Sequence, residues 1–336
     1  MPALDIFNGS AFSTQEMTRA INIIPAQYGL INQLGIFKEK GISTTSVSVE
    51  RKNGSLNILT ATERGGTGTA NNTGKRDLVS VNIPNFTHYD TIKAEDVQNV
   101  RKFDTENELE SVQDVVNERL AELKAKHEIT LEYMRATALQ GHIKDGSGKE
   151  LCDLFGLFGI TQKTQQFKTS AAGTNVPTLL RDVKRYIKKN LKGETMTNVL
   201  CLCSGEFFEA LVNHDSVKDA YANFQGKTPY REDLREDFVF NGIHFIEYDG
   251  YATNAAEKEL SFIPDKEAIF LPQGTMNVFE TVFAPADYIE AVNSKGLPYY
   301  AKQEVARFGK GVDIETQSNP LPIVKRPDLL VKAVLA

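Results

Sequence analysis

Residues 105–140 read TENELESVQDVVNERLAELKAKHEITLEYMRATALQ and carry the longest regular pattern in the chain. Mostly apolar side chains recur at intervals of three and four residues, namely Leu109, Val112, Val116, Leu120, Leu123, His127, Leu131, Met134 and Ala138. This spacing is typical of one face of an α-helix. Thr105 and Glu108 form a capping box, and Gly141 supplies a stop. The sequence therefore predicts one helix of about 50 Å, called the beam helix below, in which His127 packs as a hydrogen-bonded residue rather than a catalyst.

The residues before the beam helix predict two strands joined by a long loop. Val47 and Val49 alternate with polar residues, and Asn53-Gly54 is a strong hairpin signal because both residue types tolerate positive φ. ERGGTGTANNTGKR (63–76) has almost nothing apolar to bury, so we expect it to be mobile in the isolated chain. Alternation resumes at Leu78 and stops at Pro84. A loop of this length is usually functional.

The first forty residues are mostly polar, and Pro25, Gly29 and Gly35 interrupt their scattered apolar side chains. Only short helical turns are predicted there. Such an arm cannot bury its own apolar groups. We therefore expect residues 1–92 to form no core in the isolated subunit, and the arm to lie against another surface.

An α/β region is predicted beyond the beam helix. A hairpin around Asp145-Gly146 comes first, and a helix then begins near Pro177, after Asn175, and ends near Gly193. The elements expected next are a strand at 198–204, a helix from 206 to about 224, one strand at 238–248 and another at 268–272. The last sixty residues alternate again and end in a short apolar strand.

Composition excludes several classes of protein. The chain has 336 residues, enough for one large domain or two ordinary ones, with 41% hydrophobic and 24% charged residues. The net charge of −6 argues against a broad electrostatic grip on nucleic acid. Three cysteines exclude a disulfide scaffold. No secretory signal and no membrane-spanning run is recognised, so we expect a soluble cytosolic protein.

Sequence patterns for nucleotide, metal or nucleophilic chemistry are incomplete. The glycines at 65–69 precede a predicted strand instead of the helix that a phosphate-binding loop needs. Residues 146–149 lack the first glycine and the metal-binding hydroxyl of a P-loop. Cys201 and Cys203 share one strand face and are expected in the core, and no histidine shows ligand spacing. We therefore expect no enzyme, no cofactor and no metal site.

One charged patch is organised at helical spacing. It consists of Arg181, Lys184, Arg185, Lys188, Lys189 and Lys192, opposite an apolar face. The simplest interpretation is the solvated face of an amphipathic helix. The functional interpretation is a contact with an acidic partner surface, such as the acidic start of a neighbouring beam helix. Nucleic acid ranks third, given the net charge.

Three stretches occur in an order that resembles a known family. The first is Arg64-Gly65-Gly66, followed by Lys75-Arg76 and Ile83-Pro84; the second is FNGIHFIEYDG (240–250) with IPDKEAIFLPQGT (263–275); the third is Gln317-Ser318 and Pro320-Leu321 with Pro327-Asp328. With the arm, the two-stranded loop, the beam helix and the α/β region, this order resembles the lambda-type capsid protein E family of tailed-bacteriophage major capsid proteins.

The resemblance implies an α+β fold, the major capsid fold of tailed phages and herpesviruses. Residues 1–40 would form the N-terminal arm and 41–92 the extended β-hairpin loop. The peripheral domain would comprise 93–174, with the long spine helix at 105–140, and 281–336. An inserted α/β axial domain would occupy 175–280.

The resemblance also implies function. The chain would self-assemble as hexamers and pentamers into an icosahedral shell around double-stranded DNA, without sequence-specific binding. Because this chain starts almost directly at the arm, a separate scaffolding protein is expected. A portal and a possible decoration protein would be further partners, and no membrane is involved. The location would be the virion capsid, and the host cytoplasm during assembly. The residues expected at intersubunit contacts are Arg51, Arg64, Gly65, Gly66, Lys75, Arg76, Arg181, Lys184, Arg185 and Lys188.

Two alternatives stay open at this point. An encapsulin-like nanocompartment shell protein shares the fold by resemblance and differs in its cargo. An enzyme without a recognisable motif is disfavoured, because a long beam helix and a mobile loop serve no obvious pocket and no titratable constellation emerges.

Overall fold

The structure, a computed structural model, describes residues 13–25, 29–52, 76–97, 112–169, 173–192, 194–218, 238–254 and 256–336. The chain forms two compact units and alternates between them along its length. The first unit comprises residues 1–47, 82–132 and 281–322, and the second comprises 48–81, 133–280 and 323–336. The roles that we assigned to segments of the chain, such as arm and axial domain, stay predictions.

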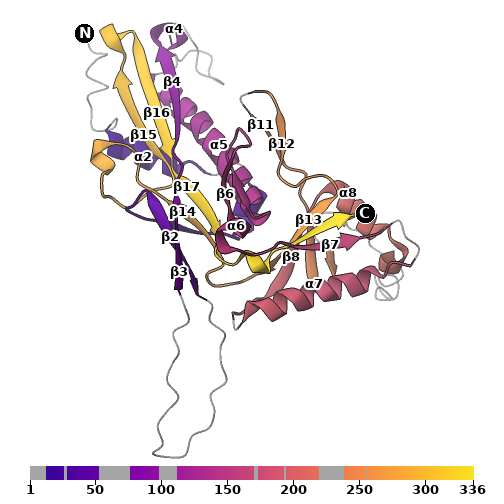
Figure 1. The fold of residues 1–336 in the computed structure, drawn as a ribbon. Helices are drawn as coiled ribbons and strands as arrows, with labels where there is room; N and C mark the ends of the chain where they lie inside the picture. The colour runs from indigo at the N-terminus through magenta and orange to yellow at the C-terminus, as the bar shows by residue number, and fades with distance from the viewer. Residues whose placement is uncertain are drawn as a thin grey trace, which may run out of the picture. The chain divides into compact units, whose positions relative to one another are not determined.

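The predicted beam helix is α5, Val112–Leu139 (Figure 1). Its expected capping box lies outside the described residues. The predicted apolar face is buried at each of its positions from Val116 to Ala138. The helix stops as expected, and Gly141 has a φ of 93°, which glycine adopts without strain. The one-sided pattern fails near the end, because all residues from 131 to 139 are buried.

Part of the predicted arm is a regular helix that packs on its own chain. α2 (Thr14–Ile23) is ten residues long, and its N-cap Ser13 accepts a hydrogen bond from the Glu16 N–H. Met17 and Ile21 are buried in a cluster with residues of α5. The expectation that residues 1–92 form no core is therefore wrong for α2, whose apolar spacing outweighs the polar composition of the segment.

Two charged side chains of α5 hold the backbone that follows α2. Lys124 donates to the carbonyl oxygen of Ile24, and its ammonium lies 5.1 Å from the centre of the Tyr299 ring. Glu132 accepts a 2.6 Å hydrogen bond from the Ile31 N–H in the short helix α3 (Leu30–Gln33). Buried charges of this kind satisfy backbone groups that would otherwise lose their bonds to water.

Two of the sheets have three strands each. One has the order β15-β16-β4, is antiparallel throughout, and is built from β15 (Tyr300–Val305), β16 (Gly311–Ser318) and β4 (Phe86–Lys93). The other has the order β1-β14-β17, from β1 (Lys38–Gly41), β14 (Phe279–Phe283) and β17 (Pro320–Val324). Short helical segments are α4 (Ala94–Val97), η2 (Ile289–Ala291) and η3 (Arg307–Gly309). Residues that we expected in the extended loop thus also belong to a sheet, through β4.

The predicted two-stranded loop is confirmed at its base. β2 (Ser46–Lys52) pairs with β3 (Arg76–Asn82), and the Ile83 N–H donates to the Thr45 carbonyl at 2.9 Å. The expected turn at Asn53-Gly54 and the glycine-rich stretch lie outside the described residues.

The second unit is organised around a mixed six-stranded sheet of order β7-β18-β13-β8-β10-β9 (Figure 1). Its strands are β7 (Lys163–Phe167), β18 (Val331–Leu335), β13 (Glu267–Gln273), β8 (Asn198–Cys203), β10 (Ile243–Glu247) and β9 (Phe238–Phe240). The pairs β7–β18 and β8–β10 are parallel, and the other pairs are antiparallel. The strand predicted at the chain end is therefore β18. It pairs with β13, the predicted strand 268–272, which in turn pairs with β8, the predicted strand 198–204.

Two helices, α7 (Val176–Leu191) and α8 (Gly205–Val212), pack on one face of this sheet. That face carries the predicted core cysteines Cys201 and Cys203, which are both fully buried. The helix predicted after Asn175 is confirmed, because the Asn175 side chain accepts from the Thr178 N–H as an N-cap.

Two sequence predictions in this unit are wrong. The strand predicted at 238–248 is a hairpin, because Asn241 and Gly242 adopt φ of 53° and 69° and join β9 to β10. The helix predicted to run from 206 to about 224 is interrupted, because it stops at Val212 and resumes at 215–218, and its predicted end lies outside the described residues. At the break, the His214 ring accepts from the Ser216 N–H, a bond that competes with the helical ladder.

Smaller elements complete the second unit. The predicted hairpin at Asp145-Gly146 joins β5 (His142–Lys144) to β6 (Glu150–Asp153), and α6 (Leu154–Phe158) follows. β11 (Tyr251–Thr253) pairs with β12 (Glu259–Ser261), and η4 (Pro327–Leu329) precedes β18. Among the described residues, every helix is too short or too polar to span a membrane.

Candidate assembly surfaces

The predicted contact residues of the loop fall on or beyond the β2–β3 pair. Arg51 is the second-last residue of β2, and Arg76 is the first residue of β3. Arg64, Gly65, Gly66 and Lys75 lie outside the described residues. The structure therefore places two of these six residues on paired strands, where their backbones join the loop to the rest of the chain.

The basic face of α7 is positioned by the burial of its opposite side. Val183 and Ile187 lie in the core, which leaves Arg181, Arg185 and Lys188 exposed. Local bonds orient two of these side chains. Arg181 donates to the Pro177 carbonyl and the Thr178 hydroxyl, both at 3.3 Å, and Arg185 lies 3.5 Å from Asp182. In water such exposed pairs are weak, so the cations stay available to a partner.

Lys184 behaves differently from its neighbours. Its ammonium donates to the carbonyl oxygens of Asn241 and Gly242, each at 3.2 Å, and the side chain is half-buried. This residue therefore braces the β9–β10 turn of its own chain. The structure brings Arg181, Arg185 and Lys188 together on one surface and assigns Lys184 to internal support.

Arg326 is a positioning residue that we did not single out from the sequence. Its guanidinium donates to the carbonyls of Asn190 and Leu191 at the end of α7, where backbone acceptors lack helical partners. Asp328 holds it with bonds of 3.3 Å and 2.9 Å. The arginine and aspartate on either side of Pro327 are the signal that could have revealed this clamp.

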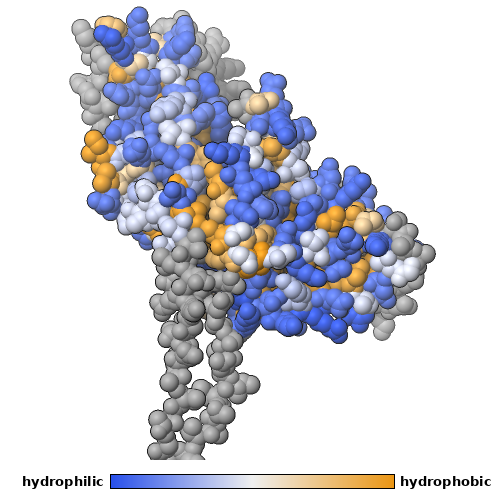
Figure 2. All heavy atoms as spheres, in the orientation of Figure 1, coloured by the Kyte–Doolittle hydropathy of each residue, from blue (hydrophilic) through white to orange (hydrophobic). Residues whose placement is uncertain are grey.

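A second surface missed by the sequence analysis is apolar. Ile289 is 92% exposed and Val292 is 65% exposed, at and just beyond η2. Figure 2 shows hydrophobic residues gathered over this segment between β14 and β15. Lys302 of β15 lies 5.4 Å from the centre of the Tyr288 ring and donates to Glu290 of η2 at 3.0 Å. That hydrogen bond lowers the pKa of Glu290.

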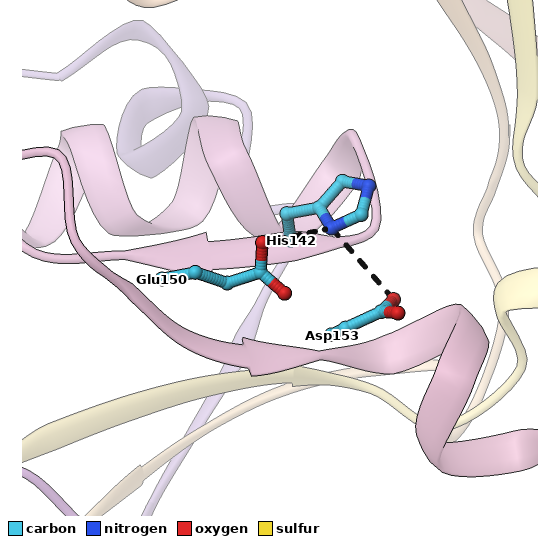
Figure 3. Close-up of side chains that lie close together, drawn as sticks. All are labelled: His142, Glu150 and Asp153. Atoms are coloured by element: carbon cyan, nitrogen blue, oxygen red, sulfur yellow. Dashed lines mark ion pairs between the residues drawn. The ribbon is translucent and has the colours of Figure 1, made fainter.

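A third group of side chains lies at the β5–β6 hairpin (Figure 3). The Nδ1 atom of His142 is 3.6 Å from a carboxylate oxygen of Glu150 and 3.7 Å from one of Asp153. One ligand atom from each residue lies within 4.8 Å of the other two. The sequence shows no ligand spacing around any histidine. The three side chains come from two strands, and only the pairing of those strands brings them together.

The family model described as phage major capsid protein E matches residues 13–335 of this chain. The chain belongs to the phage major capsid protein E family. This membership confirms the resemblance found in the sequence, and it makes the chain a structural protein of a phage capsid.

Individual relatives agree with the family. The major capsid protein of Pseudomonas phage KPP10 is 28% identical over 342 residues, and the match covers 97% of each chain. The major capsid protein of Salmonella phage Felix O1 is 24% identical, and the match covers 96% of each chain. The similarity thus extends over nearly the full length of this chain and of both relatives.

Solved structures confirm the fold class. The capsid structure of cyanophage P-SCSP1u gives a TM-score of 0.53 at 13% identity, and the match covers 93% of this chain and 89% of that one. The capsid of Myoviridae phage XM1 gives 0.50 at 11% identity, covering 94% and 95%. The capsid protein E family member described here therefore has the α+β fold of tailed-phage major capsid proteins.

Proposed function

We propose that the chain assembles as hexamers and pentamers that close an icosahedral shell around double-stranded DNA. The observation that carries this proposal is the family match over residues 13–335, which covers nearly the whole chain. Repeated contacts between identical copies close into rings when their rotation closes. Assembly of a capsid shell needs no catalysis, so we expect that the protein is not an enzyme.

The segments of the chain take the roles expected from the sequence. Residues 1–40 act as the arm, 41–92 as the extended loop and 175–280 as the axial domain, while 93–174 and 281–336 form the peripheral domain. The net charge of −6 suits a wall that encloses DNA without sequence-specific binding. Scaffolding, portal and decoration proteins are the proposed further partners, with assembly in the host cytoplasm.

An encapsulin-like compartment shell is the second candidate for this fold. The family model and both curated relatives are phage capsid proteins, and this favours a phage head over a compartment with an enzyme as cargo.

Electron microscopy of the expressed chain tests the proposal. The chain is expressed with and without its neighbouring genes, and we expect negative stain to show capsomer rings or closed shells. Deleting residues 65–74, which lie in the glycine-rich stretch, should leave a folded subunit that assembles poorly. A monodisperse small oligomer under every condition would contradict shell assembly, and unchanged shells from the deletion variant would contradict the role of the loop.

We propose that Arg181, Arg185 and Lys188 contact an acidic surface of a neighbouring copy. Replacing all three with glutamate should leave the subunit folded, because their side chains are exposed, and should prevent assembly through repulsion between like charges. Circular dichroism measures folding, and sedimentation measures assembly.

Two controls separate contact from stability. Replacing Lys218, Lys258 and Lys310 with glutamate makes the same change in net charge at exposed positions on other elements, and should leave assembly intact. Lys184→Met should instead weaken the subunit by about 1 kcal/mol, because two carbonyls lose their donor. If both triple variants assemble equally poorly, the change in net charge alone explains the defect, and the proposed α7 contact is contradicted.

A further inference from the structure

The β5–β6 hairpin gathers three side chains whose donor atoms suit a metal ion. Strand pairing places His142 directly opposite Asp153, so both side chains emerge on the same face of the hairpin. Glu150 is three residues before Asp153, and in a regular strand that spacing would put the two carboxylates on opposite faces.

An irregularity in the pairing corrects this spacing. Ile143 pairs with Cys152 and Lys144 pairs with Glu150, so one strand carries an extra residue between these pairs. A β-bulge of this kind re-aims the side chains that flank it. Glu150 therefore joins Asp153 beside His142, as Figure 3 shows. Cys152 lies between the two in sequence and is not part of the group.

Neighbouring residues hold two of the three side chains in place. One oxygen of Asp153 accepts a 2.9 Å hydrogen bond from the Phe155 N–H, because Asp153 is the N-cap of α6. The Phe155 ring lies edge-on to the His142 ring, with centres 6.4 Å apart. Gly141 permits this packing, since a Cβ atom there would overlap the Phe155 ring. Such outer contacts are what orient ligands in metal sites.

The Nδ1 atom of His142 itself is left without a hydrogen bond. It is buried from solvent, and no donor or acceptor within the described part of the chain bonds to it. Both carboxylate oxygens near it are at 3.6–3.7 Å, too far for a hydrogen bond. If the Nδ1 atom and one of these oxygens were each about 2.1 Å from the same ion, their present separation would correspond to a ligand–ion–ligand angle of roughly 120°.

We propose that His142, Glu150 and Asp153 bind a divalent transition-metal ion of the Zn²⁺ type, with water in the remaining position. One imidazole nitrogen and two carboxylates favour Zn²⁺ over Mg²⁺ or Ca²⁺, which prefer sites made only of oxygen. A small rotation of the exposed Glu150 side chain brings its oxygen to bonding distance. The ion would tie the two strands of the hairpin together just beyond the end of α5.

Titration of the unassembled subunit with ZnCl₂ tests the site, with isothermal calorimetry as the readout and Cys152→Ser as the common background. We expect one ion per subunit, and a melting temperature that rises with Zn²⁺ concentration as binding stabilises the folded state. Co²⁺ should give visible absorption bands from the same site. Glu150→Gln and Asp153→Asn should each weaken binding by more than about tenfold.

The variants and ions make the outcome decisive. Asparagine caps helices as well as aspartate, so Asp153→Asn should keep α6 intact. His214→Ala, which removes a histidine of α8's C-terminal turn region, should bind Zn²⁺ like the parent. Equal Zn²⁺ binding by Glu150→Gln and the parent would overturn the site, as would Mg²⁺ binding as tight as Zn²⁺. Since the measurement uses single subunits, its failure would leave the proposed shell function untouched.

Discussion

Gly296→Ala is expected to lower the free energy of unfolding by about 3 kcal/mol or more, enough to deplete the folded subunit. A Cβ atom at this position would overlap the carbonyl group of Phe283. The backbone on both sides is tied, because the Gly296 N–H donates to the Ile42 carbonyl at 2.8 Å and the Ile42 N–H donates to the Phe283 carbonyl at 2.9 Å. Neither backbone segment can therefore move aside without losing hydrogen bonds.

Urea unfolding followed by far-UV circular dichroism measures this effect. The matched control is Gly146→Ala, because a Cβ atom there meets no atom within 4 Å and the backbone is not in the positive-φ region. We expect the control to stay within about 0.5 kcal/mol of the parent. Equal unfolding midpoints for the two variants would refute the steric argument. Shell formation should fail in Gly296→Ala as a consequence of the lost fold.

Acidification from pH 7 to pH 4.5 is expected to destabilise the isolated subunit, with about 2 to 3 kcal/mol of the loss arising at His127. The Nε2 atom of this residue lies 3.0 Å from the Thr316 hydroxyl in a buried position. Burial first, and then the nearby His88, lower the pKa of His127 from 6.5 to about 4. The pKa of His88 is lowered as well, by burial and by Lys126.

The direction follows from proton uptake. Above pH 6.5 both folded and unfolded chains hold His127 neutral, and the free energy of unfolding does not depend on it. Between 6.5 and about 4 only the unfolded chain takes up the proton, so stability falls as the pH falls. His127→Gln removes this titration, and its stability should depend less on pH by the stated amount. The same pH dependence in His127→Gln and the parent would exclude His127 as the cause.

Long periodic segments were the most predictable part of the fold. The three-and-four spacing of α5, the Asn175 cap of α7 and the alternation of β2 and β3 are local patterns, and each appears in the structure. These patterns reflect backbone geometry and capping, which act within one segment. The family order read from them was sufficient to recognise the capsid fold.

Predictions that depended on distant contacts were less successful. α2 is buried because α5 and the β15–β16–β4 sheet offer it an apolar surface, and that surface is assembled from remote parts of the chain. In the sequence, Asn241 and Gly242 lie within what reads as one strand. The antiparallel pairing of β9 with β10 shows that they form a turn between two strands. The basic residues of α7 were identified correctly as one face, but only the fold revealed that Lys184 serves the β9–β10 turn.

The amino-acid sequence by itself determined the class of the protein, its beam helix and the absence of a recognised catalytic motif, because periodicity, caps and motif order are written locally. Tertiary structure alone decided which charges are buried, which cations of α7 remain exposed, and how His142 meets Glu150 and Asp153. The physical reason is that pairing across a hairpin and packing between remote segments bring side chains together at distances that sequence separation does not encode.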